Sequence, residues 1–171
     1  MAYRHPDKIY PDPHDLVPVI EKEKQAGKTI VLTNGVFDLL HVGHLRCLLS
    51  SRNEGDLLIV ALNSDDYVCR HKTPDGPVNP LAARMELISG FACVDYVTSF
   101  DGDTASDILR LLKPHVHAKG TDYSSTMLPE RETNRELGIK MAFVGDPKQH
   151  SSTDLRQHAS SPPTTSETDV P

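Results

Sequence analysis

The sequence has few cysteines, no long apolar run and no excess of basic residues. Its three cysteines, Cys47, Cys69 and Cys93, show no Cys-x-x-Cys spacing, which argues against a disulfide framework and a zinc cluster. No apolar run approaches the roughly 20 residues of a membrane span, and no signal-peptide core follows the N-terminal charges. These absences predict a cytoplasmic (cytosolic) protein with reduced thiols and no membrane partner.

The charge balance is acidic, with 18 Lys and Arg against 24 Asp and Glu and a formal net charge of −6. Nucleic acid is therefore not an expected partner. Hydrophobic residues make up only 37% of the 171 residues, which predicts a modest core with polar sequence outside it. The C-terminus is rich in Ser, Thr and Pro. We therefore expect an N-terminal extension (residues 1–13), one domain (14–157) and a disordered tail (158–171).

Segments of strand character alternate with segments of helical period along the domain. The expected strands cover residues 29–33, 57–62, 96–99, 115–118 and 141–145. The expected helices cover residues 15–25, 44–54, 81–89, 104–112 and 130–137. This alternation predicts an α/β fold, a Rossmann-like three-layer sandwich with a parallel five-stranded sheet. Because ligands bind at the carboxyl ends of such strands, function is expected in loops 34–43, 63–79, 119–123 and 146–153.

The loop after the first of these strands carries the strongest signal. It reads Asn-Gly-Val-Phe-Asp-Leu-Leu-His-Val-Gly-His over residues 34–44 and leads directly into a helix. His41 and His44 are three residues apart, so their imidazoles are expected side by side at the helix N-terminus, where unpaired N–H groups and the dipole favour an anion. The pattern predicts a phosphate site that is neither a Walker loop nor a GxGxxG motif. No further ligand at a recognisable spacing supports a metal site here.

Residues 35–44, GVFDLLHVGH, resemble the signature of the HxGH nucleotidyltransferase superfamily. Other segments resemble the bacterial D-glycero-β-D-manno-heptose 1-phosphate adenylyltransferases: residues 63–65, 70–72, 77–81 with 84–85, 94–97, 113–114, 119–123 and 152–153. The resemblance spans residues 14–157. It implies that an oxygen of a sugar 1-phosphate attacks the α-phosphorus of ATP, so that an ADP-heptose forms and pyrophosphate leaves.

The resemblance also implies residue roles. His41, His44 and Lys72 would be catalytic, holding phosphates and stabilising charge in the transition state. The expected nucleotide contacts are Asn34, Gly35, Phe37, Lys119, Gly120, Asp122, Ser151, Ser152 and Thr153. The expected sugar-phosphate contacts are Asp38, Arg70 and Arg84. Mg²⁺ would be carried by the nucleotide, with no metal site in the protein itself.

Several of these residues have a structural alternative. Asp38 could orient its loop by accepting backbone N–H bonds, and Arg84 could pair with a neighbouring acid. Residues 151–153 could cap the helix that follows them. His115 and His117 alternate along a strand, which would suit a metal pair, but without further ligands a structural role is preferred.

Other functions also remain open. A CTP-dependent cytidylyltransferase acting on an alcohol phosphate such as glycerol 3-phosphate is one, and an FAD synthetase is another. A non-catalytic nucleotide-binding module is a third, although the intact His41, His44 and Lys72 argue against it. Resembling enzymes are commonly dimers, so a homodimer is expected. Some relatives carry a fused sugar kinase, for which a chain of this length has no room, so we expect a separate kinase to supply the sugar 1-phosphate.

Overall fold

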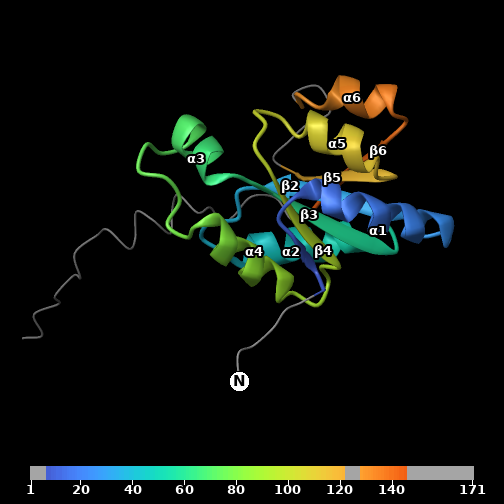
Figure 1. The fold of residues 1–171 in the computed structure, drawn as a ribbon, viewed down its shortest axis with the longest axis horizontal. Helices are drawn as coiled ribbons and strands as arrows, with labels where there is room; N and C mark the ends of the chain where they lie inside the picture. The colour runs from blue at the N-terminus through green and yellow to red at the C-terminus, as the bar shows by residue number, and fades with distance from the viewer. Residues whose placement is uncertain (1–6, 122–127, 146–171) are drawn as a thin grey trace, which may run out of the picture.

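The computed structural model describes residues 7–121 and 128–145 (Figure 1). Strands and helices alternate along these residues, as the sequence predicts. In chain order they are β1 (Ile9–Tyr10), α1 (Pro13–Gln25), β2 (Ile30–Gly35), α2 (Val42–Arg52), β3 (Leu57–Asn63), α3 (Asp65–His71), α4 (Leu81–Ser89), β4 (Tyr96–Phe100), α5 (Ser106–Leu112), β5 (Val116–Gly120), α6 (Arg131–Glu136) and β6 (Lys140–Val144).

The strands form one parallel sheet in the order β1-β4-β3-β2-β5-β6. Helices α2 and α4 pack on one face of the sheet and α1 and α5 on the other, so the molecule has three layers (Figure 1). The predicted α/β, Rossmann-like fold is therefore confirmed, with six strands in the described residues in place of the five expected.

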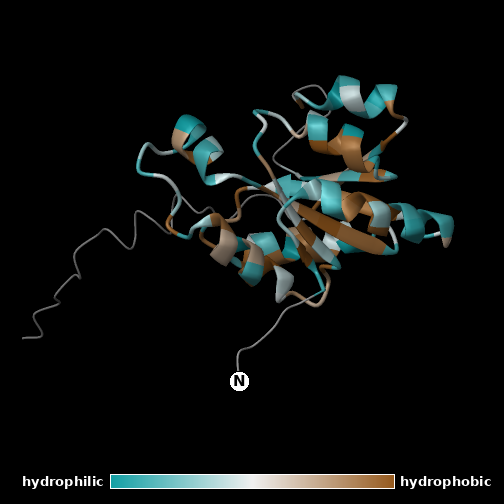
Figure 2. Cartoon of the chain, viewed as in Figure 1, coloured by the Kyte–Doolittle hydropathy of each residue, from teal (hydrophilic) through white to brown (hydrophobic). Residues whose placement is uncertain are grey.

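The alternation of side chains along β3 shows why the sheet is buried on both faces. Leu58, Val60 and Leu62 join the core under α2 and α4, whereas Ile59 and Ala61 join the core under α1 and α5. A strand covered on both faces reads as a continuous apolar run, and Figure 2 shows the hydrophobic residues concentrated in the strands and on the inner sides of the helices.

The additional strand, β1, lies in the segment that the sequence assigned to an N-terminal extension. Ile9 pairs with Val97 and Tyr10 with Thr98, so the described sheet begins before residue 14. Two residues are too few to show a hydrophobic period, and only the pairing with β4 makes them a strand.

Helix α3 lies in the stretch that was expected to be a loop. Ser64 caps it by accepting a hydrogen bond from the Tyr67 N–H, and Asp65 and Asp66 occupy its first turn. The capping signal is therefore present in the sequence. Among the residues of the helix only Val68 is buried, so no apolar stripe marks it.

The order of the strands locates a crevice. From β2 the chain moves outward through β3 to β4, then returns to place β5 on the other side of β2. The loops after β2 and β5 therefore leave the sheet in opposite directions, and the space between them is where sheets of this kind bind ligands.

Candidate active site

Two histidine rings lie side by side at the N-terminus of α2, as their spacing predicts. His41 is the N-cap residue with an extended backbone, and His44 is in the first turn. The centroids of their rings are 3.9 Å apart and the ring planes are tilted by 32°. The positive dipole end of α2 is at the same place, which makes this helix end suited to an anion.

His44 is held as a neutral hydrogen-bond donor. Its Nδ1 accepts a hydrogen bond from the backbone N–H of His41 at 3.3 Å. Burial, followed by the charge of His41, lowers the pKa of His44 to about 4. A neutral ring whose Nδ1 accepts carries its proton on Nε2. Nε2–H is therefore the donor that His44 can offer a phosphate.

Phe37 packs against His44 from the core side of α2. Its ring centroid lies 5.3 Å from that of His44, and the side chain is buried in the core under α2. Its φ of +51° lies in the left-handed region, which is uncommon for a bulky residue. The structure shows Phe37 packed beside His44, and its predicted nucleotide contact stays a prediction.

A pocket of about 150 Å³ opens at the carboxyl ends of the strands. It brings together four predicted site residues from three loops, namely Asn34, Gly35, Lys72 and Lys119. The remaining lining residues are Val36, Asn63, Tyr67, Phe100, Asp103, Thr104, Ala105, Pro129 and Glu130. His41, His44, Arg70 and Arg84 are not among its lining residues.

A buried polar chain fixes the predicted nucleotide contacts Asn34 and Lys119. The Asn34 Oδ1 accepts hydrogen bonds from Lys119 Nζ at 2.9 Å and from His117 Nε2 at 3.1 Å. His117 Nδ1 lies 3.0 Å from Asn134 Nδ2. Burial, followed by the charge of Lys119, lowers the pKa of His117 to about 4, so the ring bridges the two asparagines in its neutral form.

His117 belongs to this group of side chains, although the sequence did not predict it as a site residue. The preferred structural role is consistent with its burial, but its partners include two predicted site residues. One signal was available, because His117 and Lys119 are two apart on a strand and so share a face. The sequence could not show that Asn34 of β2 and Asn134 of α6 meet that face.

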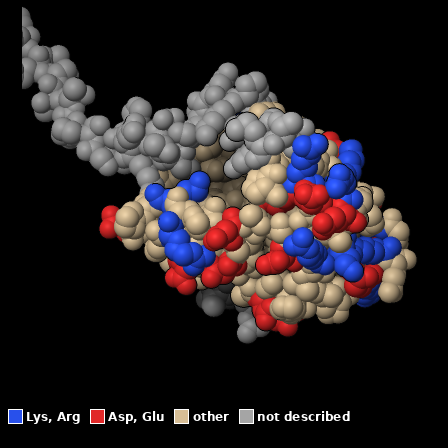
Figure 3. All heavy atoms as spheres, turned by 90° about the horizontal axis from the view of Figure 1, so that it is seen from above, with Lys and Arg blue, Asp and Glu red and all other residues tan. Residues whose placement is uncertain are grey.

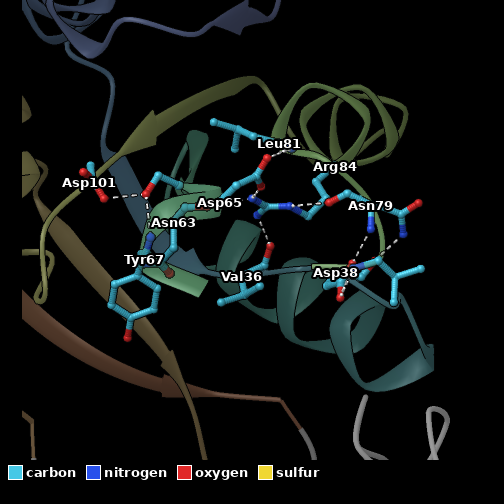
Figure 4. Close-up of polar contacts among 11 residues, drawn as sticks. Val36, Asp38, Asn63, Asp65, Tyr67, Asn79, Leu81, Arg84 and Asp101 are labelled. Carbon is cyan, nitrogen blue, oxygen red and sulfur yellow. Dashed lines mark hydrogen bonds and ion pairs between the residues drawn. The ribbon is translucent and has the colours of Figure 1, made fainter. Parts of the chain in front are cut away.

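Arg84 has a different role from the one predicted. It has no exposed surface, and its guanidinium donates to the carbonyls of Val36, Asn63 and Asn79 and pairs with Asp65 at 2.6 Å (Figure 4). All three of its nitrogens are used inside the protein. Arg84 therefore joins three loops, which is the structural alternative to the predicted sugar-phosphate contact, and all its guanidinium nitrogens have protein acceptors.

Asp38 also has the structural role that was its alternative, which is to orient its loop by accepting backbone N–H bonds. The carboxylate is buried and accepts hydrogen bonds from the backbone N–H groups of Val78 at 3.0 Å and Asn79 at 2.8 Å (Figure 4). Asn79 Nδ2 in turn donates to the Asp38 carbonyl at 3.0 Å. Asp38 thus fixes the loop after β2 to the segment before α4, as the structural alternative to a sugar contact predicts.

Helix α3 is tied to the loop after β4 by ion pairs. Arg70 pairs with Asp101 at 2.9 Å, and His71 Nε2 lies 2.8 Å from Asp103 Oδ1. These contacts hold α3 over the strand ends and bring Lys72, its C-cap residue, to the pocket. Arg70 is half-exposed and pairs with both Asp101 and Asp103, and its predicted contact with the sugar phosphate stays a prediction.

Some predicted residues cannot be placed. Asp122, Ser151, Ser152 and Thr153 lie outside the described residues. Gly120 ends β5 and pairs with Val144 of β6.

Basic and acidic side chains alternate over the face of the molecule shown in Figure 3, so the net negative charge forms no single patch there. Within residues 7–121 and 128–145, no helix is long and apolar enough to cross a membrane.

The sequence matches known families and structures. Residues 32–158 match the family model described as cytidylyltransferase-like. The protein named bifunctional protein HldE from Methylococcus capsulatus is 41% identical over 140 residues, which is 81% of this chain and 30% of that protein. The HldE of Geotalea uraniireducens is 43% identical over 122 residues, or 71% of this chain and 24% of that protein. The chain thus spans less than a third of the length of these relatives.

A solved structure supports the same assignment. The crystal structure of the lipopolysaccharide core biosynthesis protein from Thermoplasma volcanium superposes with a TM-score of 0.58 at 26% sequence identity. The match covers 71% of this chain and all of that one. Since the family model covers most of the chain and its histidine-containing helix end, the chain belongs to the cytidylyltransferase-like family and is a nucleotidyltransferase.

Proposed function

We propose that this nucleotidyltransferase joins ATP and D-glycero-D-manno-heptose 1-phosphate to give ADP-heptose and pyrophosphate. The observation that carries the proposal is the end of α2, where His41 and the neutral donor His44 stand at a helix N-terminus. The strand ends also hold a pocket with two lysines. The heptose is proposed from the resemblance and from the similarity to the HldE proteins and to a lipopolysaccharide core biosynthesis protein.

The reaction needs positioning and charge neutralisation more than a base. An oxygen of the sugar phosphate, already ionised at neutral pH, forms a bond to the α-phosphorus of ATP while the bond to the bridging oxygen of pyrophosphate breaks. His44 Nε2–H would donate to the oxygens of the α-phosphate, where negative charge grows in the transition state. Lys72 and Lys119 would attract the two anionic substrates to the strand ends.

Mg²⁺ would accompany the triphosphate. In the part of the chain that the structure describes, no three His, Cys, Asp or Glu side chains gather to hold an ion. Phosphate oxygens and waters would supply most of the ligands, as Mg²⁺ commonly prefers. The ion would neutralise charge on the leaving pyrophosphate, while the side chains of this protein orient the α-phosphate.

A pyrophosphate-release assay tests the proposal. The purified protein is supplied with ATP, CTP, GTP or UTP, each crossed with heptose 1-phosphate and glycerol 3-phosphate in the presence of Mg²⁺. Turnover with ATP and heptose 1-phosphate is expected to exceed that of every other pair. Turnover confined to CTP and glycerol 3-phosphate would overturn the proposal, and no turnover with any pair would favour a nucleotide-binding module.

A CTP-dependent reaction is the second candidate, because the matching family is described as cytidylyltransferase-like. The same crossed assay separates the two, since the acceptor and the nucleotide are varied independently. FAD synthetase activity would require a flavin acceptor and can be added as a further arm.

Assembly, location and substrate supply remain predictions. The expected homodimer can be measured by light scattering coupled to gel filtration. A separate kinase that supplies the sugar 1-phosphate is expected from the resemblance, whereas the curated relatives are named bifunctional and are about three times as long.

A further inference from the structure

Glu130 is a buried carboxylate in the wall of the pocket, and only one of its oxygens is used. The residue is 3% exposed. Its Oε1 accepts a hydrogen bond from the Ala105 N–H at 2.9 Å, just before α5. Its Oε2 is buried, and no group in residues 7–121 or 128–145 donates to it. A buried carboxylate oxygen without a donor is costly, and a ligand hydroxyl would remove that cost.

The wall around Glu130 carries charges of both signs. Asp103 is a second carboxylate lining the pocket, and Thr104 adds a hydroxyl. Lys72 and Lys119 line the same pocket. Carboxylates repel a phosphate and accept hydrogen bonds from hydroxyls, whereas lysines attract a phosphate. A pocket of this composition fits a ligand that carries both a phosphate and hydroxyls.

The position of Glu130 indicates which substrate it meets. The histidines proposed to hold the nucleotide phosphates stand on α2, which packs on one face of the sheet. Glu130 is bonded to the start of α5, which packs on the opposite face. The two sites therefore reach the strand ends from opposite sides, and neither histidine lines the pocket. The predicted nucleotide contacts Asn34, Gly35 and Lys119 line the pocket from β2 and β5, so the acceptor substrate is assigned to the other wall, which Glu130, Asp103 and Thr104 form.

We propose that Glu130 is a specificity-determining residue that accepts a hydrogen bond from a hydroxyl of the acceptor sugar phosphate. This inference rests on the proposed function, because it assumes that the acceptor is a sugar 1-phosphate. A ribose hydroxyl of the nucleotide would offer the same donor chemistry, so the experiment must separate the two substrates.

The test compares Glu130→Gln with Glu132→Gln. The glutamine at 130 keeps an oxygen for the Ala105 N–H but replaces the acceptor Oε2 by a donor. Glu132 lies on α6, is exposed and pairs only with Arg135 among the described contacts, which makes it a matched control. We expect Glu130→Gln to raise the KM for the sugar phosphate by about tenfold or more, the usual scale for a hydrogen bond to a charged group. The KM for ATP should stay unchanged, and Glu132→Gln should change neither KM.

Other outcomes would overturn the inference. A raised KM for ATP alone would assign Glu130 to the nucleotide, and unchanged values for both substrates would leave it only as a support for α5. If Glu130→Gln does not fold, the wild-type enzyme is assayed with monodeoxy analogues of the sugar phosphate. Equal KM values across that series would contradict the inference. Wild-type turnover of heptose 1-phosphate in the same assay shows whether the proposed function itself has failed.

Discussion

The end of α2 and the cluster around Arg84 are both built from polar residues near the strand ends, yet they use their donors differently. Arg84 has no exposed surface and gives all its nitrogens to protein acceptors. The Nδ1 of His44 accepts a hydrogen bond from a backbone N–H, and no described residue pairs with its Nε2. A group can bind a ligand only with hydrogen-bonding capacity that the fold has not already used.

If this comparison is right, removing Arg84 should affect folding most. Arg84→Met leaves three carbonyls in or near the core and the Asp65 Oδ1 without their donor, so we expect a loss of about 3 kcal/mol in the free energy of unfolding. Urea unfolding followed by circular dichroism measures it. Arg70→Met is the control, because its half-exposed ion pair should contribute at most about 1 kcal/mol. Similar losses for the two variants would contradict the role assigned to Arg84.

Removing His44 should lower the catalytic rate strongly and the stability only slightly. His44→Ala takes away a donor to the transition state, so kcat should fall at least about a hundredfold, equivalent to about 2.7 kcal/mol. The free energy of unfolding should change far less than in Arg84→Met. Rapid-quench or steady-state pyrophosphate release measures the rate, with His14→Ala, exposed on α1, as the control. A near-wild-type rate would remove His44 from the mechanism.

The smallest expected effect is the contribution of His117 to the dependence of stability on pH. Its pKa is lowered from 6.5 to about 4 in the folded protein, so the unfolded chain binds a proton there first as the pH falls. The contribution of neutral His117 to the free energy of unfolding is therefore fully present above pH 6.5, and it is lost progressively as the pH falls to about 4. At pH 5.5 the loss from this one group is on the order of 1 kcal/mol.

The measurement is urea unfolding of wild type and His117→Gln at pH 7.5 and pH 5.5. The variant should lose less stability than the wild type between the two pH values, because glutamine does not titrate. It should be less stable than the wild type at pH 7.5, where the bridge between Asn34 and Asn134 is disturbed. An identical pH dependence in both proteins would show that His117 titrates normally.

The sequence predicted most of the fold because most elements carry their own signal. The boundaries of α4 were predicted without error, and β3 was recognised as a buried run. Strand β1 was not predicted because two residues show no hydrophobic period, and α3 was not predicted because only one of its side chains is buried. In both elements the stabilising partner, β4 or the loop after it, is distant in the chain.

The candidate site divides in the same way. The side-by-side rings of His41 and His44 followed from helix geometry, which depends only on sequence spacing. The roles of Arg84 and Asp38 did not follow, because their partners are backbone groups of loops up to 48 residues away. Backbone carbonyls and N–H groups exist at every position, so a sequence gives no sign of which ones a side chain will meet.

By itself, the sequence determined the alternation of strands and helices, the parallel sheet and the paired histidines at the end of α2, since each depends on residues that are neighbours in the chain. The tertiary structure alone decided which polar groups keep a free donor or acceptor. It gave Arg84 and Asp38 to loop packing, gave His117 to the support of Asn34, and left the buried Glu130 Oε2 without a donor among the described residues. The physical reason is that hydrogen-bonding capacity is limited, and distant parts of the chain use it first.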